Sequence, residues 1–471
     1  MWKMKTEYDT IRMAITYAGG KESRWFSQAA TGDHPIRSGP FGGLTRKEYD
    51  ALFNEFEKLK QLIKRNTSAK VLDLKVLLQE TLDNWRGDKK KLRNLVSTCF
   101  PEDWSRVEKL LGDKWMDLTA GEIFGEKCPM FMEGDEIKMG IRPVSRISNT
   151  GDLGHMTPAG FIVSRRKSWV RSREDGITKA IFENHPDFVE NVNILPAFKG
   201  DAFMEGGDVM CLNEDSMAVG IRSSTNREAA VEISRALPEK RVYAVLKYPE
   251  ELRTSWTVHY GLHLNYMFSM VDEGKALVAP YVFDYPKGSK KTLMNMLKTL
   301  SDDLYKWEPV REESDLNPKN WPKIPHRLKP RIESRVYGGL SKDRVEAFRD
   351  VGKVEIYKGG KLTSKKDSFI QALIEDEVLD PDGVTLVGGD PGDIDYRNEF
   401  HHWITSIREG GWACCVLTVK PGIVVAYYDM FKTNEALEDH GVKVITMDPR
   451  YIKQMTGTGF GDLILPLWRS N

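Results

Sequence analysis

Two widely separated stretches of the chain contain the same order of predicted elements. Residues 208–246 have the pattern of strand, turn, strand, Thr-Asn pair, helix and strand, and residues 415–447 repeat it. The predicted strands are 209–212, 217–222 and 242–246 in the first copy and 415–419, 423–428 and 442–447 in the second, with helices at 228–237 and 435–440. The Thr-Asn pairs have the short oxygen-bearing side chains that cap the first turn of a helix. A repeated unit of this kind constrains the chain to an architecture of packed copies.

Three weaker copies bring the predicted number to five. They are an opening unit with a strand at 11–18, a helix after Thr45 and a strand at 70–74, a hairpin within 266–283, and a stretch from 341 to 390 with a helix at 342–349 and strands near Val354 and Thr385. Strand groups with one covering helix, repeated around an axis, give a radial α/β architecture whose loops converge on the centre. We therefore predict a single domain, residues 1–471, built as a five-module α/β propeller.

One part of the chain departs from this pattern. Between about residues 77 and 124 the apolar residues recur only at helical spacing. This change of period predicts an α-helical insert, residues 76–145, after the first module.

The charges balance, with 69 basic and 69 acidic side chains, so there is no electrostatic case for binding nucleic acid or an anionic membrane. The opening residues lack the apolar core of a secretory signal, and no apolar run approaches the ~20 residues of a transmembrane helix. We expect a cytoplasmic protein whose partner is a small-molecule substrate or a protein, with homo-oligomerisation left open.

Cysteine usage gives no sign of a cross-linked or metal-bound framework. The cysteines are odd in number and lack C-x-x-C spacing: Cys99, Cys128, Cys211, Cys414 and Cys415. Reduced, mostly buried thiols are therefore expected, and neither a metal nor a cofactor is predicted.

Several motifs resemble those of the arginine deiminases. The most specific is Phe203-Met-Glu205-Gly-Gly-Asp208, which is similar to the F-x-E-G-G-D motif of that family. The other landmarks follow in the family's order: Leu262-His263-Leu-Asn265, Gly388-Gly-Asp390, Pro421-Gly-Ile-Val-Val-Ala-Tyr427 and Asp462-Leu-Ile-Leu-Pro-Leu467. The chain thus resembles a divergent member of the arginine deiminase and amidinotransferase (pentein) superfamily, which implies a five-fold α/β propeller with a helical insert.

The resemblance also implies an active site. In the family a cysteine attacks the guanidinium carbon, a histidine moves protons and carboxylates hold the guanidinium. His263 matches the histidine and Glu205 matches a guanidinium-binding carboxylate, and Asp208 of the same motif is expected among the substrate-binding residues.

Three positions depart from the family pattern. Asn265 replaces a carboxylate, Arg165 aligns with a guanidinium-binding aspartate, and Asp462 stands at the position of the nucleophilic cysteine. A carboxylate is a poor nucleophile towards a guanidinium carbon because it is already the preferred ion-pair partner of that group. The usual covalent route is therefore closed, unless Cys414 or Cys415 supplies another thiol.

Two interpretations of the altered site remain open. Arg165 and Asp462 could form an ion pair that fills the old cavity, or Arg165 could stay free and bind an anion. The predicted function is an enzyme acting at a C–N bond of an arginine-related or other nitrogenous substrate without the usual cysteine, with Glu205, His263 and Asp462 as its catalytic residues. The alternative is a catalytically inactive protein of the same fold with a binding or scaffold role.

Overall fold

The computed structural model describes most of the chain. It covers residues 1–20, 46–249, 262–295, 346–390 and 402–470, except 102, 128–129, 134–135, 145, 168–170, 286, 403–404, 407–408, 410–411, 449 and 457. Cys128 and Thr45, the residue before the predicted first helix, lie outside the described residues.

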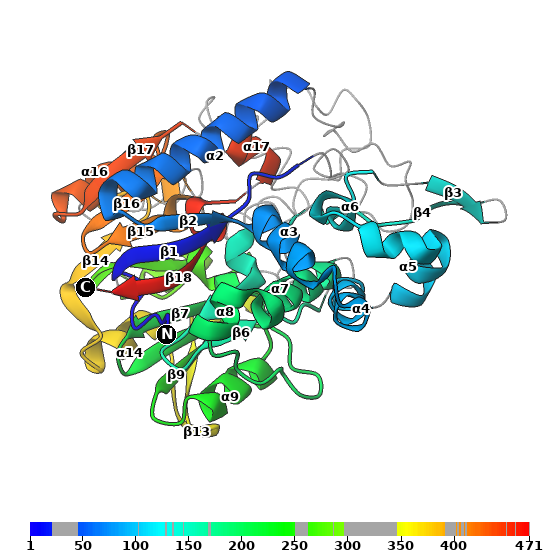
Figure 1. Ribbon diagram of the computed structural model, residues 1–471. Helices are drawn as coiled ribbons and strands as arrows, with labels where there is room; N and C mark the ends of the chain where they lie inside the picture. Colours follow the sequence, from blue (N-terminus) through cyan, green and yellow to red (C-terminus); the bar gives the residue numbers. More distant parts are fainter. Residues whose placement is uncertain are drawn as a thin grey trace, which may run out of the picture.

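Four sheets share one pairing pattern, in which the first two strands are antiparallel and the second and third are parallel. Their strands are β7 (Val209–Asn213), β8 (Ser216–Ile221) and β9 (Arg241–Leu246); β10 (Phe268–Asp272), β11 (Gly274–Val278) and β14 (Leu379–Leu386); β15 (Leu417–Lys420), β16 (Ile423–Tyr427) and β17 (Lys443–Met447); and β18 (Ile464–Ser470), β1 (Thr10–Thr16) and β2 (Lys70–Asp73). In the last sheet the C-terminal strand β18 lies beside the N-terminal strand β1 (Figure 1).

A helix connects the second and third strand of each of these sheets. The four helices are α9 (Arg227–Ala236), α14 (Phe369–Glu375), α16 (Phe431–Asp439) and α2 (Arg46–Thr67). Parallel strands need a crossover connection of this kind, whereas an antiparallel pair can be joined by a tight turn. We call each such set of strands and helix a unit.

A further unit was not identified in the sequence. Strands β5 (Gly154–Met156) and β6 (Phe161–Val163) form an antiparallel pair, and Phe161 makes a parallel bridge to Ile194. Helices α7 (Ser172–Asn184) and α8 (Pro186–Asn191) lie between these two points of the chain. The order of elements is therefore the same as in the other units.

The predicted copy from 341 to 390 is wrong as a single unit. Strands β12 (Val354–Lys358) and β13 (Lys361–Lys366) extend the β7–β9 sheet, because β12 pairs with β9. Helix α14 and strand β14 instead complete the sheet that begins with β10 and β11. A long connection that pairs with a neighbouring sheet thus separates the parts of one unit.

The two Thr-Asn pairs have different roles. Asn226 caps α9, since its side chain accepts a hydrogen bond from the backbone of Ala229 at 3.1 Å. The pair Thr433-Asn434 lies inside α16, which begins at Phe431, so that predicted cap is wrong. Thr433 instead donates its hydroxyl to the buried Glu409.

Helices fill the connection between β2 and β5. They are α3 (Leu74–Trp85), α4 (Lys89–Thr98), α5 (Trp104–Leu111) and α6 (Ala120–Phe124), and a hairpin of β3 (Met130–Glu133) and β4 (Glu136–Met139) follows them. Leu78, Leu95 and Ile123 belong to a hydrophobic cluster that also contains Val209 and Leu465 of the sheets. Whether this region is best regarded as an insert in one domain stays a prediction.

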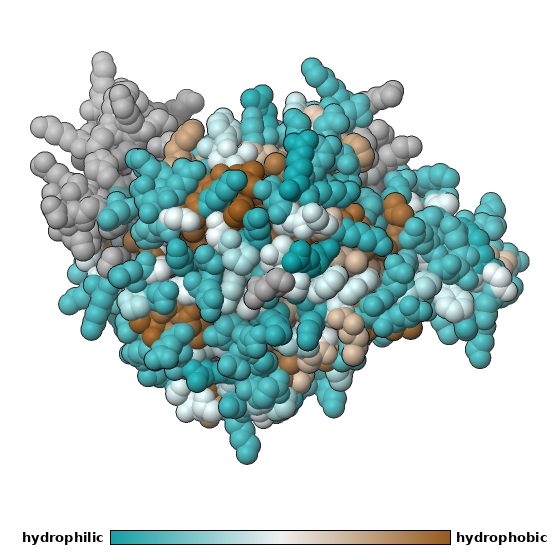
Figure 2. Space-filling model, turned by 60° about the vertical axis from the view of Figure 1, so that its left-hand side comes forward, coloured by the Kyte–Doolittle hydropathy of each residue, from teal (hydrophilic) through white to brown (hydrophobic). Residues whose placement is uncertain are grey.

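The face shown in Figure 2 is largely hydrophilic, with hydrophobic residues gathered in small patches. No helix in the described part of the chain combines the length and apolar composition that crossing a membrane requires.

Candidate functional site

Four short turns bring titratable side chains together. Each lies directly before the first strand of a unit: Asp152 before β5, Glu205 before β7, His263 before β10 and Asp462 before β18. All four residues are buried. The start of α7 adds two more side chains, and the central cluster is defined here as Asp152, Arg171, Glu174, Glu205, His263 and Asp462.

His263 lies between carboxylates on both sides of its ring. Its Nδ1 is 3.3 Å from Asp152 Oδ1 and 3.8 Å from Asp462 Oδ2, while its Nε2 is 3.4 Å from Glu205 Oε2. Burial alone lowers the pKa of His263, but the three carboxylates outweigh it and hold that pKa well above its usual value. The ring is therefore an imidazolium at neutral pH and can donate a proton.

The guanidinium of Arg171 occupies the space between three carboxylates. Its Nη1 is 2.8 Å from Glu205 Oε2, and its Nη2 is 3.1 Å from Asp152 Oδ2 and 2.9 Å from Glu174 Oε2. Its side chain is only 11% exposed. Arginine presents a planar fork of donors, which suits several carboxylates at once. The cluster therefore binds a guanidinium, and in this structure the guanidinium belongs to the chain itself.

Two carboxylates of the cluster differ in pKa. Burial opposes ionisation of Glu205, but Arg171 and His263 hold the pKa of Glu205 well below its usual range. Burial raises the pKa of Asp152 to about 6, although His263 acts against this shift. Within the described residues no hydrogen bond reaches Asp152 Oδ1. Asp152 Oδ1 therefore faces the ring of His263 as an ion-pair partner without a hydrogen bond, and the pKa of this carboxyl is close to neutral.

Asp462 is held by hydrogen bonds of its own. Asn265 donates its Nδ2 to Asp462 Oδ1 at 2.5 Å, and the hydroxyl of Thr458 donates to Oδ2. Burial raises the pKa of Asp462, but His263, Thr458 and Asn265 together lower it by more. The pKa of Asp462 is therefore below its usual value. Asn265 therefore supports the carboxylate at the position where the family has its nucleophile.

Arg165 does not join the central cluster. Its Nη1 donates to the carbonyls of Phe198 at 3.2 Å and Gly200 at 2.7 Å, and the residue is exposed. The predicted Arg165–Asp462 ion pair is therefore wrong, and Arg165 gives no free cation to a buried anion site. Neighbouring residues in extended chain point to opposite faces, so Arg165 points outwards where the next residue points inwards.

Arg166, the next residue, points inwards. Its side chain is fully buried, with Nη2 3.4 Å from Glu174 Oε2 and Nε 3.8 Å from Glu205 Oε2. It also forms an ion pair with Asp175. A fixed cation thus borders the central cluster, although the sequence assigned that place to Arg165.

Asp208 is part of a separate buried clamp. Lys247 Nζ lies 2.5 Å and 2.7 Å from its two carboxylate oxygens, and both side chains are inaccessible to solvent. Ser224, Thr225 and the backbone of Leu264 also donate to this carboxylate. The clamp ties the turn before β7 to the turn before β10, and the Asp208 amide donates to the carbonyl of Glu205 at 3.1 Å within the same turn. Its predicted role in substrate binding stays a prediction.

The two adjacent cysteines point in different directions. Cys414 Sγ lies 3.5 Å from the carbonyl of Leu277, whereas Cys415 Sγ lies against Gly459 and Gly461 in the turn that carries Asp462. Burial and the charge of Asp462 raise the pKa of Cys415 well above its usual value. A protonated thiol is a weak nucleophile, so the resting state contains no thiolate at this position.

Sequence reasoning missed Asp152, Arg171 and Glu174. One signal was available: Gly151-Asp152 repeats the Gly-Asp pairs of Gly207-Asp208 and Gly461-Asp462, and each pair precedes the first strand of a unit. A second signal is the spacing of Arg171 and Glu174, which places both on one face of a helix.

Comparisons with known proteins agree with the motifs. A family model described as arginine deiminase matches residues 48–305. The chain is 24% identical over 232 residues to an arginine deiminase of Borrelia recurrentis, covering 44% of this chain and 54% of the relative. It is 22% identical over 379 residues to an arginine deiminase of Staphylococcus aureus, covering 78% of this chain and 72% of the relative. The match thus spans about half the length of the first of these relatives and nearly three quarters of the second.

Two solved amidinotransferases also match over the full chain. One is from Microseira wollei, with a TM-score of 0.47, 11% identity and coverage of 100% of this chain and 98% of that one. The other is an inosamine-phosphate amidinotransferase from Streptomyces griseus, with a TM-score of 0.42, 11% identity and coverage of 100% and 97%. Because the family model spans more than half of its residues, the chain belongs to the arginine deiminase family.

Proposed function

We propose that this protein acts at a C–N bond of a guanidino-bearing substrate without the cysteine nucleophile of its family. The observation that carries the proposal is the position of Arg171, whose guanidinium lies among the carboxylates of Asp152, Glu174 and Glu205, next to His263. A cluster that binds the guanidinium of Arg171 this closely is also suited to bind the guanidinium of a substrate. In the proposed cycle the guanidinium of the substrate takes the place of Arg171.

The charged groups of the cluster suit a hydrolysis by water. Asp152, with its pKa near 6, takes a proton from a water molecule whose oxygen forms the new bond to the guanidinium carbon. One C–N bond then breaks, and the imidazolium of His263 gives its proton to the leaving nitrogen. Glu205 holds the positive charge that remains on the substrate. The hydroxyl proton passes to the neutral ring of His263 as the carbonyl forms, and Asp152 gives its proton to the released amine or ammonia. The products are a urea-type carbonyl and an amine or ammonia.

The thiol at Cys415 has no part in this route. It is fully buried behind the turn of Asp462, and its high pKa keeps it protonated. Substituting it therefore tests the mechanism directly. The variant Cys415→Ala is expected to retain turnover, whereas His263→Gln is expected to lose it.

The assay measures release of ammonia and of the urea-type product from arginine, agmatine and methylated arginines. Arg165→Ala is the matched control, because Arg165 is an exposed arginine whose guanidinium donates to the carbonyls of Phe198 and Gly200. Turnover that disappears in Cys415→Ala, together with a covalent adduct on that thiol, would refute the thiol-free route.

The same position of Arg171 also suits a catalytically inactive protein. In that case the arginine is a permanent part of a binding or scaffold protein. The two functions differ in the behaviour of Arg171→Ala. Turnover by the wild-type chain or by this variant supports the enzyme. If neither protein turns over any of the substrates and neither binds arginine, the inactive alternative is supported.

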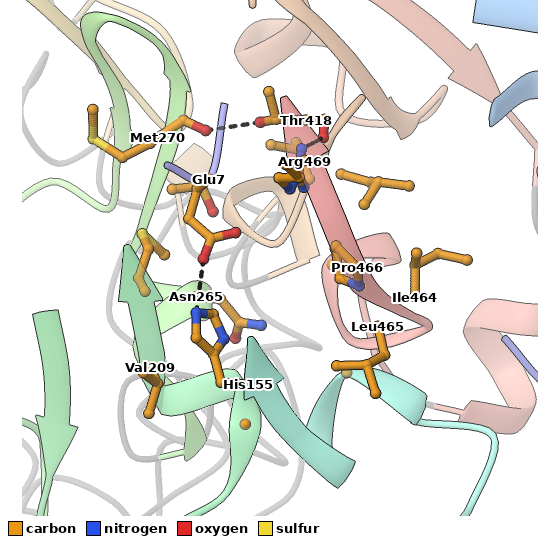
Figure 3. Close-up of a pocket in the computed structure, with 18 of the residues that line it drawn as sticks. Glu7, His155, Val209, Asn265, Met270, Thr418, Ile464, Leu465, Pro466 and Arg469 are labelled. Atoms are coloured by element: carbon orange, nitrogen blue, oxygen red, sulfur yellow. Dashed lines mark hydrogen bonds and ion pairs between the residues drawn. The ribbon is translucent and has the colours of Figure 1, made fainter. Parts of the chain in front are cut away.

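The units are proposed to close into a five-module propeller, which would explain why their turns meet. A cavity is lined by residues from the first strand of every unit, β5, β7, β10, β15 and β18, among them His155, Val209, Met270, Thr418 and Leu465 (Figure 3). First strands that surround one cavity are expected of a radial arrangement. A crystal structure with the units in a linear or paired order would contradict it.

A further inference from the structure

A second group of potential ligands lies away from the charges of the central cluster. Glu7 comes from the N-terminal segment, His155 from β5 and Cys211 from β7. His155 Nε2 is 3.2 Å from Glu7 Oε1 and 3.8 Å from Cys211 Sγ. One donor atom from each residue lies within 4.8 Å of the other two. Carboxylate, imidazole and thiol groups thus converge from three distant parts of the sequence.

These separations fit a tetrahedral metal ion. Zinc binds oxygen and nitrogen at roughly 2.0–2.2 Å and sulfur at roughly 2.3 Å, so tetrahedral angles place neighbouring ligand atoms about 3.2–3.6 Å apart. The distances of 3.2 Å and 3.8 Å from His155 Nε2 need only a few tenths of an ångström of adjustment, and the donor atoms of the third pair, Glu7 and Cys211, lie within 4.8 Å of each other. The mixture of imidazole, thiolate and carboxylate is also a set that favours zinc over magnesium or calcium.

The backbone holds the three residues in place. The Glu7 amide donates to the carbonyl of Cys211 at 2.9 Å, and the Cys211 amide donates back to Glu7 Oε1 at 3.2 Å. Cys211 and His155 lie on β7 and β5, whose partner strands fix their positions. A binding site that is organised in this way loses little conformational freedom when a metal enters.

Two of the three proposed ligands border a cavity. Glu7 and His155 line the cavity that the first strands surround, and Figure 3 shows the side chain of Glu7 directed towards His155 beside it. Three protein ligands and a position open to a cavity are the arrangement of zinc sites that keep a water or a small ligand.

The charges around the three residues are also compatible with a divalent cation. Arg469 is buried and interacts electrostatically with Glu7, Asp9 and Cys211. With the thiol of Cys211 ionised, three negative groups outnumber the two cations that act on them, Arg469 and Lys240, so a metal cation would meet net negative charge. The metal would replace the thiol proton, which passes to solvent.

We propose that Glu7, His155 and Cys211 bind one zinc ion, with a water or a small ligand from the cavity at the fourth position. The metal would join the N-terminal segment to the first strands of two units. This site is independent of the proposed activity, because none of its ligands belongs to the central cluster.

The test begins with the whole wild-type chain. Protein stripped with a chelator is dialysed against zinc and then against buffer, and bound metal is measured by mass spectrometry. About one zinc per chain is expected, together with a higher urea midpoint than the stripped protein. Cobalt in place of zinc is expected to give the near-ultraviolet absorption band of a thiolate-to-metal bond. Absence of both bound zinc and this band overturns the proposal without any variant.

Variants then locate the metal. Cys211→Ser and Glu7→Gln are expected to lose the zinc, and Glu7→Gln also serves if Cys211→Ser fails to fold. Cys99→Ser is the matched control, since Cys99 is equally buried and is not one of the proposed ligands. Retention of zinc in Cys211→Ser, or its loss in His263→Gln, would assign the metal to another site and refute the proposal.

Discussion

Replacing Arg171 with alanine is the change that the central cluster should tolerate least. The guanidinium makes hydrogen bonds to Asp152, Glu174 and Glu205, whose side chains are 1%, 2% and 12% exposed. Removing one partner of a buried ion pair costs roughly 3–5 kcal/mol, because the other charge stays buried without compensation. Water that enters the space left by the side chain lowers this cost, so we expect a loss of about 3 kcal/mol at neutral pH.

The loss of stability in Arg171→Ala should become smaller as the pH is lowered. The pKa of Asp152 is already raised to about 6 by burial, and loss of Arg171 removes a cation that lowers it. Protonation of Asp152 then relieves the uncompensated charge in acid, so Arg171→Ala should be less harmful near pH 5 than near pH 8. The measurement is urea-induced unfolding followed by tryptophan fluorescence; urea is used because guanidinium chloride would fill the site.

Addition of a small guanidinium compound should rescue the variant. A ligand that binds only the folded state adds about 2.7 kcal/mol at a hundred times its dissociation constant. Methylguanidinium at millimolar concentration should therefore raise the urea midpoint of Arg171→Ala and leave that of the wild type almost unchanged. Arg165→Ala should stay within about 0.5 kcal/mol of the wild type, as is usual for exposed positions.

The reasoning fails if Arg171→Ala unfolds at the same urea concentration as the wild type. It fails equally if potassium chloride of the same ionic strength rescues the variant as well as methylguanidinium does. In either case the three carboxylates would not form a specific guanidinium site.

Three further changes probe neighbouring features. Lys247→Met should destabilise the chain by roughly 3–5 kcal/mol in urea, since Asp208 is left buried without its cation, and the double variant with Asp208→Asn should recover part of that loss. Gly207→Ala should cost about 1–3 kcal/mol, because its Cβ would lie 2.6 Å from His263 Nδ1, while Gly87→Ala, which meets nothing within 4 Å, serves as the control. The raised pKa of His263 means that its stabilising effect is fully present below about pH 6.5 and is lost as the pH rises through its folded-state pKa. The difference in urea midpoint between the wild type and His263→Gln should therefore shrink as the pH is raised, and a constant difference would contradict the assigned charge.

The sequence predicted the units best where all their elements are consecutive. The stretch 208–246 contains three neighbouring strands and the covering helix α9, and the structure confirms this order. The unit that begins with β10 was not recognised as a whole because the hairpin β12–β13 interrupts it and pairs with β9. Local periodicity shows that a strand exists, but its partner depends on contacts between distant residues.

The residues of the candidate site were also predicted best where the local sequence carries a recognisable motif. Glu205, His263 and Asp462 could be placed together because each stands in a recognisable motif before the first strand of a unit. Arg165 was placed wrongly because neighbouring residues in extended chain point to opposite faces, and the inward face belongs to Arg166. The proposed metal ligands could not be found by spacing, since Glu7, His155 and Cys211 come from three separate elements.

The charges around the central cluster bear on the proposed exchange of Arg171 for a substrate. Five carboxylates, those of Asp152, Glu174, Asp175, Glu205 and Asp462, lie among four basic groups, which are Arg146, Arg166, Arg171 and His263. Exchange of Arg171 for the guanidinium of a substrate leaves this balance unchanged, so electrostatics does not decide between the two occupants.

The competition between Arg171 and the guanidinium of a substrate depends instead on their effective concentrations. A group tethered to the chain by a short segment has an effective concentration of roughly millimolar. A free guanidino compound must exceed this value or make additional contacts, which lowers its apparent affinity for the wild type. Arg171→Ala should consequently bind arginine more tightly than the wild type does in calorimetric titration. Equal or weaker binding by the variant would mean that the guanidinium of a substrate does not use the place of Arg171.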